Sequence, residues 1–322
     1  MQPDLSVIIV SYNCRPQLAD CLTSLAPDRR DLALEVIVID NASSDETAAM
    51  VRERFGWARL IANDVNRGFA AANNQGLKVA SGRNVLFLNP DTVVHEGTLK
   101  TLVRTLDGAP KIGACGPQLL NADGTIQPSL RRFPTFAALL HQYTPLRVLR
   151  ILRGAYRRYK MADFDFKTAA DVDVLMGACL CVPARVLAEV GPMDERFFVY
   201  FEEMDLCNRI HKAGYRVRFE PAARITHVGG VSAATATASL FFCRSLFRYL
   251  RKHNGRLKSL GMSITLRIGM FMREAVLLVV NLVAALALAV VGQGQRARRR
   301  LDRARSSLRF LCRDGWLALF RP

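Results

Sequence analysis

The sequence lacks the patterns that define several common classes of protein. Its eight cysteines form no Cys-x-x-Cys pair and have no zinc-type spacing, so we interpret them as reduced thiols of a cytosolic protein. No basic segment with an apolar run and a small-residue cleavage site precedes the first predicted strand, which argues against a signal peptide. No Gly-x-Gly-x-x-Gly motif follows that strand, which argues against a dinucleotide-dependent oxidoreductase.

An excess of positive charge is nearly absent from the first three quarters of the chain. The formal net charge is +17, yet residues 1–240 contain 28 Lys and Arg against 25 Asp and Glu. Residues 241–322 contain 17 Lys and Arg against only 3 acids. Nucleic-acid binding needs a basic stripe on a folded module with a recognisable reading element. We therefore predict a globular domain over residues 1–240 that has no nucleic-acid partner.

The basic C-terminal quarter is also apolar. The chain is 50% hydrophobic with a mean hydropathy of +0.11, which suggests membrane contact. Residues 275–292 are apolar except for Asn281 and only just long enough to span a bilayer. Arginines flank both ends, so a spanning helix, a helix in the cytoplasmic interface and a re-entrant hairpin all stay open. We predict that residues 241–322 form a helical tail that associates with a membrane surface.

The N-terminal part has the pattern of an α/β protein. Residues 5–10, 35–39 and 84–88 are continuous apolar runs, which are typical of strands buried on both faces. Residues 16–25 and 45–55 have helical patterns between them, and we expect Ser43 or Ser44 to cap the second helix. This alternation predicts a parallel sheet with right-handed crossovers.

The middle of the chain has a weaker pattern. Residues 121–170 look irregular, and residues 131–160 contain eight Lys and Arg and no acid. This basic segment is consistent with membrane contact, with a positively charged acceptor-binding face, or with a solvated helix. The sequence does not decide among these interpretations.

Polar residues follow three of the predicted strands. They are Ser11-Tyr12-Asn13, Asp40-Asn41 and Asn89-Pro90-Asp91. Parallel strands end at one edge of a sheet, and ligands of such sheets bind beyond that edge. A carboxylate such as Asp40 suits the imide N–H of a pyrimidine or a ribose hydroxyl. Asp91 suits Mg²⁺ or Mn²⁺, which prefer carboxylate oxygens and phosphates.

Residues 197–209 place three acids directly behind an aromatic run. Burying acids costs several kcal/mol each unless they are paired, bound to metal or used in chemistry. The alternative is a solvated first turn of a helix, where acids are favourable. The two upstream loops with acids, and His227 downstream, favour a functional site.

Five motifs together resemble the inverting glycosyltransferases of family 2, most of all the rhamnosyltransferase-like subgroup that builds bacterial cell-surface glycans. The motifs occupy residues 6–13, 38–45, 66–76, 86–91 and 198–207. The resemblance implies the GT-A fold, with a Rossmann-like nucleotide-binding half and a mixed central sheet. It implies a nucleotide-sugar-binding half over residues 1–120 and an acceptor-binding, catalytic half over residues 121–240.

The resemblance also implies roles for the residues that match the motifs. The nucleotide-sugar-binding residues would be Val10, Ser11, Tyr12, Asp40, Arg67, Asn73 and Asn89. Asp91 would be the carboxylate ligand of a divalent metal, and His227, in the loop of residues 227–232, a second ligand of the metal or the diphosphate. Many relatives have Glu-Asp where this chain has Glu202-Glu203, and the Asp is their usual base.

By that correspondence Glu203 is the catalytic base and Glu202 a supporting acid, although the doubled Glu leaves the choice between them open. Asp205 and Arg209 lie one turn apart and are expected to pair and support the helix.

The predicted function is inverting transfer of a sugar from a nucleoside-diphosphate sugar to a glycan or lipid-linked acceptor. It would use Mg²⁺ or Mn²⁺ and act at the cytoplasmic face of the bacterial inner membrane. One alternative is a catalytically silent scaffold that binds sugar nucleotides. The other is a processive polysaccharide synthase, but the Gln-x-x-Arg-Trp motif of those enzymes is missing.

Overall fold

The structure, a computed structural model, describes residues 2–229 and 236–314 of the chain. It divides into two compact units, residues 1–133 with 161–234 and residues 134–160 with 235–322. We call them the sheet unit and the helical unit. The predicted boundary at residue 240 assigned residues 134–160 to the globular domain, whereas in the structure this segment groups with the C-terminal helices.

A mixed nine-stranded sheet, counted over the described residues, organises the sheet unit in the order β3-β2-β1-β4-β10-β6-β11-β5, with β8 also paired to β11. Its strands are β1 (Leu5–Ser11), β2 (Leu34–Asp40), β3 (Arg59–Ala62), β4 (Asn84–Leu88), β5 (Thr92–Val94), β6 (Ile112–Leu120), β8 (Ala170–Val172), β10 (Cys179–Pro183) and β11 (Arg216–His227). A two-stranded sheet pairs β7 (Leu130–Arg131) with β9 (Val174–Leu175). The three predicted strands are confirmed, and β1 is parallel to both β2 and β4.

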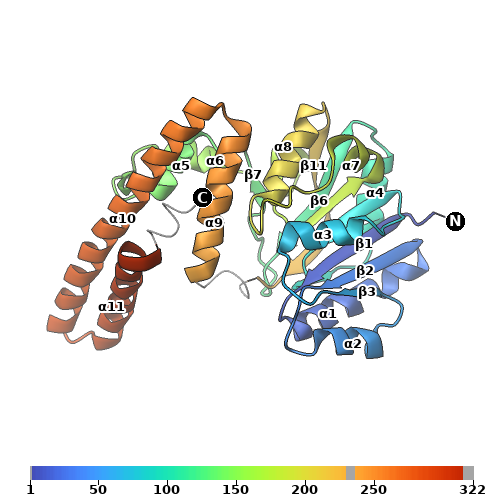
Figure 1. Ribbon diagram of the computed structural model, residues 1–322, viewed down its shortest axis with the longest axis horizontal. Helices are drawn as coiled ribbons and strands as arrows, with labels where there is room; N and C mark the ends of the chain where they lie inside the picture. The colour runs from blue at the N-terminus through green and yellow to red at the C-terminus, as the bar shows by residue number, and fades with distance from the viewer. Residues whose placement is uncertain (1, 230–235, 315–322) are drawn as a thin grey trace. The chain divides into compact units, whose positions relative to one another are not determined.

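Helices cover both faces of the sheet (Figure 1). They are α1 (Arg15–Leu25), α2 (Thr47–Arg54), α3 (Phe69–Leu77), α4 (Thr98–Asp107), α7 (Ala184–Val190) and α8 (Glu202–Lys212), with a 3₁₀ turn at Pro27–Arg30. Alternate residues of β1 face opposite sides, so Val7 and Ile9 join the core formed with α1, α2 and α4. Ile8 faces α3, where a Cβ at Gly76 would lie 2.6 Å from its side chain. Because Gly76 has no side chain, α3 can approach the sheet closely.

The predicted N-cap of α2 is wrong. The helix begins at Thr47, and the residue before it is Glu46, in a left-handed conformation with φ of 62°. The serines are engaged elsewhere, since Ser43 Oγ accepts from the backbone N–H of Asn13 at 3.0 Å and the N–H of Ser44 donates to Asn13 Oδ1 at 2.8 Å. They connect the loops after β1 and β2 instead of capping a helix.

The expectation that residues 121–170 are irregular is also wrong in part. The helical unit contains α5 (Phe136–Tyr143), a 3₁₀ turn (Pro145–Arg147), α6 (Arg153–Tyr159), α9 (Ala236–His253), α10 (Arg256–Val290), α11 (Gly294–Arg309) and a π-helical turn (Phe310–Asp314). Thr135 caps α5, because its Oγ1 accepts from the N–H of Ala138 at 3.2 Å. Within the described residues, α10 alone is long and apolar enough to cross a membrane.

Candidate active site

The parallel strands β1 and β2 bring Ser11 and Asp40 together, because these residues are register partners at the strand ends. Asp40 is buried, and its Oδ1 is a buried oxygen with no hydrogen-bond partner among the described residues. Tyr12, the next residue beyond β1, is 51% exposed. Val10 and Ser11 are buried below it, and the Ser11 hydroxyl lies 3.2 Å from Cys14 Sγ. The site therefore offers a buried acceptor oxygen at the end of β2 and an exposed aromatic ring just beyond the end of the neighbouring strand β1.

Asn41 fixes the loop that contains Arg67. Its side chain is buried, and Oδ1 accepts from the backbone N–H of Arg67 at 3.0 Å. Its Nδ2 donates to Asn66 Oδ1 at 2.8 Å, and that oxygen also accepts from the N–H of Gly68 at 2.9 Å. The motifs assigned no role to Asn41, although its position directly after Asp40 was a usable signal.

The same loop contacts the acidic segment. The N–H of Phe69 donates to the carbonyl of Phe198 at 2.6 Å. Gly68 has a φ of +83°, and a Cβ there would lie 2.6 Å from the Phe198 ring. Only glycine fits both this backbone conformation and this approach without strain. The nucleotide-side loop and the segment that begins α8 are therefore packed against each other.

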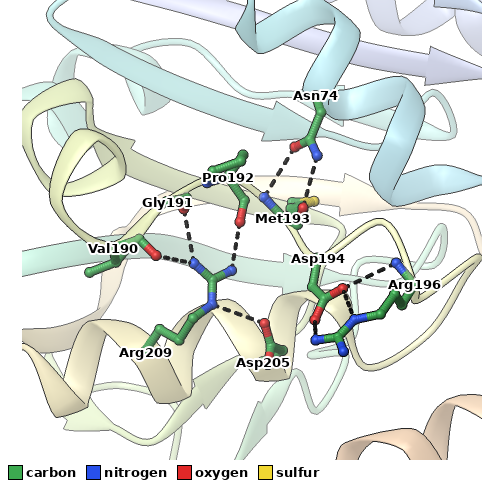
Figure 2. A network of polar contacts seen from close by, with 9 residues as sticks. All are labelled: Asn74, Val190, Gly191, Pro192, Met193, Asp194, Arg196, Asp205 and Arg209. Atoms are coloured by element: carbon green, nitrogen blue, oxygen red, sulfur yellow. Dashed lines mark hydrogen bonds and ion pairs between the residues drawn. The ribbon is translucent and has the colours of Figure 1, made fainter. Parts of the chain in front are cut away.

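Asn73 and Asn74 have different surroundings. Asn73 is buried, and its Nδ2 donates back to the carbonyl of Phe69 within α3, at 2.9 Å. Asn74 forms a two-way bond with the backbone of Met193, donating to its carbonyl at 2.8 Å and accepting from its N–H at 3.1 Å (Figure 2). Asn73 is therefore bonded within its own helix, and Asn74 cross-links α3 to the segment after α7, which the sequence motifs did not predict.

Asp91 and His227 meet because β5 pairs with β11, with Thr92 opposite His227. Asp91 Oδ1 lies 3.4 Å from His227 Nε2, and both side chains are largely buried. Residues 230–232 of the predicted loop lie outside the described residues. Asn89 follows the end of β4 nearby in sequence, and its N–H donates to the carbonyl of Ala178 at 2.9 Å.

A chain of hydrogen bonds fixes the orientation of Gln127. The Thr125 hydroxyl donates to Asp123 Oδ1 at 2.6 Å and accepts from Asn121 Nδ2 at 2.9 Å. Asn121 Oδ1 therefore faces Gln127, whose Nε2 donates to it at 3.0 Å. The same Nε2 donates to the carbonyl of His227 at 3.2 Å. These bonds leave Gln127 Oε1 pointing at the imidazole.

Gln127 in turn selects a tautomer of His227. Its Oε1 lies 2.7 Å from Nδ1, and an amide oxygen only accepts, so Nδ1 carries the proton. The lone pair of Nε2 then faces the Asp91 carboxylate. Asp91 Oδ1 and the Nε2 lone pair both accept, so at 3.4 Å they favour a cation between them. A carboxylate and an imidazole together are a suitable donor set for Mn²⁺. The described residues contain no group of three or more His, Cys, Asp or Glu side chains suited to a metal, so a metal held by this pair would need phosphates and water to complete its coordination.

The two glutamates at the start of α8 have different electrostatic environments. Burial raises the pKa of Glu202 well above its ordinary value, and the negative charge of Glu203 raises it further. Burial also raises the pKa of Glu203, but hydrogen bonds from the backbone and the charge of Arg131 oppose that rise. Such a pair separates into one protonated and one ionised acid. Both pKa values are raised, and the charge of Arg131 and the backbone hydrogen bonds favour ionisation of Glu203 over that of Glu202.

Glu203 borders a loop that reaches the end of β4. Its Oε2, like that of Glu202, is buried and has no hydrogen-bond partner among the residues that the structure describes, so each acid keeps an unused acceptor oxygen. A Cβ at Gly177 would lie 3.5 Å from its side chain, so the loop of Gly177 and Ala178 borders the carboxylate. Because the carbonyl of Ala178 also binds Asn89, this loop connects the acid to the end of β4.

Arg209 holds the segment before α8 (Figure 2). Its Nε donates to Asp205 Oδ2 at 3.0 Å, which is the predicted ion pair, and Asp205 is fully buried. The guanidinium also donates to backbone carbonyls at and just after the end of α7, those of Val190, Gly191 at 2.9 Å and Pro192 at 2.8 Å. The pair therefore supports the loop as well as the helix.

Comparison with known proteins places these features in a family. The model of the family described as "Glycosyl transferase family 2" matches residues 6–170. The chain is 29% identical over 239 residues to an N-acetylglucosaminyl-diphospho-decaprenol L-rhamnosyltransferase of Mycobacterium tuberculosis, covering 69% of this chain and 75% of that protein. It is 24% identical over 221 residues to a low-salt glycan biosynthesis hexosyltransferase of Haloferax volcanii, covering 67% and 64%.

Solved structures show the same fold. A mannosyltransferase of Pyrobaculum calidifontis, solved with GDP-mannose and Mn²⁺, has a TM-score of 0.56 at 20% identity, over 99% of this chain and 86% of that one. The mixed α/β sheet is thus the GT-A fold, as the sequence predicted.

Proposed function

The chain belongs to glycosyltransferase family 2, and we propose that it transfers a sugar from a nucleoside-diphosphate sugar to an acceptor hydroxyl with inversion at the sugar C1. The observation that supports this best is the pair of glutamates at the start of α8. Each has a buried Oε2 with no partner among the described residues, and the charge of Arg131 with the backbone hydrogen bonds favours ionisation of Glu203 over that of Glu202.

The donor would bind at the ends of β1, β2 and β4. Asp40 Oδ1 would accept from the base or the ribose, and Tyr12 would contact the base from its exposed position. Arg67 is exposed on a loop fixed by Asn41, so its charge would reach the ribose or the phosphates. Val10, Ser11 and Asn73 would form the packing behind this surface, with Asn89 at the end of β4.

Asp91 and His227 would hold a Mg²⁺ or Mn²⁺ ion together with the donor diphosphate. A bound cation supplies the positive charge that stabilises the departing diphosphate. Gln127 keeps the Nε2 lone pair of His227 directed at that position. Ser43 and Ser44, in the loop after β2, bind Asn13 and so hold the loop after β1 in place.

Glu203 would accept the proton of the attacking hydroxyl as the oxygen approaches C1 from the side opposite the diphosphate. Protonated Glu202 beside it avoids a second negative charge and leaves Glu203 as the single base. Arg209 and Asp205 support this helix from behind.

The similarity to the mycobacterial enzyme makes rhamnose the first donor sugar to test and a sugar on a diphospho-polyprenol the first acceptor. A lipid acceptor fits a membrane-associated enzyme, and we place the protein at the cytoplasmic face of a bacterial inner membrane through its helical tail.

Glu203→Gln tests the proposal. We expect turnover to fall by about 10²–10⁴-fold, because general base catalysis contributes that much. Binding of the nucleoside diphosphate with Mn²⁺, measured by calorimetry, is expected to stay near that of the wild type. Glu202→Gln is the matched control and should lose much less activity. Turnover of Glu203→Gln near the wild-type level would exclude Glu203 as the base, and product with retained anomeric configuration would exclude inversion.

A further inference from the structure

Helix α10 exposes an apolar stripe along its whole length. Most of the large exposed apolar side chains recur at helical spacing, which places them along one side, whereas exposed Val280 lies off that side. The side chains of the stripe are Leu257, Leu260, Ile264, Ile268, Met272, Val279, Leu282, Val283, Leu286 and Val290. The stripe begins well before the apolar stretch of residues 275–292 that the sequence singled out.

Three charged residues of α10, Arg267, Arg273 and Glu274, contact other helices of the helical unit, whereas Arg256 and Lys258 in its first turn are exposed. The Arg267 guanidinium lies 4.5 Å from the centre of the Phe247 ring of α9. Arg273 donates to the carbonyl of Gln142 in α5 at 3.2 Å and pairs with Glu274 at 2.6 Å. The helix is therefore two-sided, with these charges facing its own unit and the stripe facing outward.

The length of the stripe argues against a spanning helix. With 35 residues, α10 is about 52 Å long, whereas the hydrocarbon core of a bilayer is about 30 Å thick. The part of α10 that is apolar on every side except at Asn281 covers residues 275–290, which is fewer than the about 20 residues that a spanning segment needs. A one-sided stripe that runs the whole length is typical of a helix that lies in the membrane surface.

Helix α11 packs antiparallel against the apolar half of α10 (Figure 1). Arg300 Nη1 donates to Asn281 Oδ1 at 3.1 Å, and the Ser307 hydroxyl donates to Glu274 Oε2 at 2.8 Å. Arg300 thus lies beside the middle of residues 275–292. The seven arginines of α11 are Arg296, Arg298, Arg299, Arg300, Arg303, Arg305 and Arg309. If α10 spanned the bilayer with this pairing intact, these charges would lie in hydrocarbon, which is strongly unfavourable.

We propose that α10 and α11 form a hairpin that lies in the plane of an anionic phospholipid bilayer. The stripe of α10 enters the acyl boundary, and α11 lies above it at the head groups. A helix is about 10 Å across, and interfacial helices insert by about 5–10 Å. With α10 inserted to that depth, α11 on top of it lies at the level of the lipid phosphates. Seven arginines against the single acid Asp302 complement anionic lipid. The inference rests on the proposed membrane association and adds its geometry.

Vesicle binding by the full chain tests the stripe. Wild type is expected to sediment with vesicles of phosphatidylcholine and phosphatidylglycerol, and more weakly with phosphatidylcholine alone. Ile264→Glu/Ile268→Glu should weaken binding at least about 100-fold, because each isoleucine loses its apolar burial. Ile264→Leu/Ile268→Leu keeps the stripe and should bind like wild type. Both residues precede the apolar stretch, so a helix spanning at 275–292 would tolerate the Glu pair.

Labelling at the hairpin turn tests the orientation. In a Cys312→Ser background, Gln295→Cys places a thiol close to the turn between α10 and α11. Protein bound to sealed vesicles from outside should react fully with a membrane-impermeant maleimide. Protection until detergent is added would mean that α10 spans, and would overturn the in-plane arrangement.

The possible failures are distinguishable. No binding of wild type to any vesicle would overturn the membrane association itself. A concentration-dependent dimer that the Glu pair abolishes, without vesicle binding, would make the stripe a self-association surface and overturn the proposal. Transfer to a soluble acceptor glycan should be unchanged in the Glu pair, which separates this test from that of the sugar-transfer function.

Discussion

The hydrogen-bond relay through Gln127 leads to a sharp prediction about a residue that we do not expect to touch substrate. Gln127→Met keeps the length of the side chain but removes the oxygen that lies 2.7 Å from His227 Nδ1. It also removes the Nε2 donor to Asn121 and to the His227 carbonyl. The imidazole would then no longer be held in the tautomer whose Nε2 lone pair faces Asp91.

The magnitude follows from the hydrogen bonds that this substitution removes. Outer-shell partners of a ligating histidine typically contribute 10–100-fold in metal affinity, which is about 1.4–2.7 kcal/mol. Because Gln127 binds both the ring and the backbone of His227, we expect the upper part of that range. Gln127→Glu retains an acceptor for the Nδ1 proton, so its Mn²⁺ affinity should stay within several-fold of wild type.

Calorimetric titration of Mn²⁺ into the protein saturated with nucleoside diphosphate measures the effect without turnover. Thermal unfolding without metal serves as the control for folding. The tautomer argument is refuted if Gln127→Met binds Mn²⁺ like wild type while His227→Ala does not. If both variants bind Mn²⁺ normally, His227 is not a ligand.

Two further predictions concern the acidic helix. Arg209→Met should lower the free energy of unfolding by about 3 kcal/mol in denaturant titrations, because it removes the ion-pair partner of the buried Asp205. Arg15→Met is the control, because its ion pair with Glu46 joins two exposed side chains and should contribute less than about 1 kcal/mol. Equal losses in the two variants would contradict the assignment. The raised pKa of Glu202 means that its contribution to stability is fully present below the unfolded value near 4.5 and is lost as pH rises through the folded pKa. The free energy of unfolding of Glu202→Gln, minus that of wild type, should therefore be larger at pH 8 than at pH 5. An equal difference at both pH values would show that the pKa of this carboxyl is not raised.

The sheet was predictable because its strands are buried on both faces. Continuous apolar runs at residues 5–10, 35–39 and 84–88 leave few alternatives to parallel strands, and their polar ends then share an edge. The cap of α2 was not predictable in the same way. Ser43 and Ser44 have the right chemistry for a cap, but Asn13, 30 residues from Ser43 and 31 from Ser44, competes for them.

The candidate site likewise contains residues that the local sequence identified and residues that it did not. Asp40, Asp91 and Glu203 were identified from local motifs, since each follows or precedes a recognisable element. Asn41, Asn74 and Gln127 were not identified. Their partners lie 26, 119 and 100 residues away, and only the fold brings them together.

The sequence by itself determined that this protein is an α/β glycosyltransferase of family 2 with a basic, apolar tail, because periodicity, composition and motif order are local properties. Only the tertiary structure decided how the acids differ and how the tail is organised. Burial and neighbouring charge separate Glu202 from Glu203, and neither is visible in a run of two identical residues. The stripe of α10 and the position of Arg300 beside Asn281 likewise depend on how two helices pack. These features, and not the hydropathy of residues 275–292, favour a hairpin on the membrane surface over a helix through it.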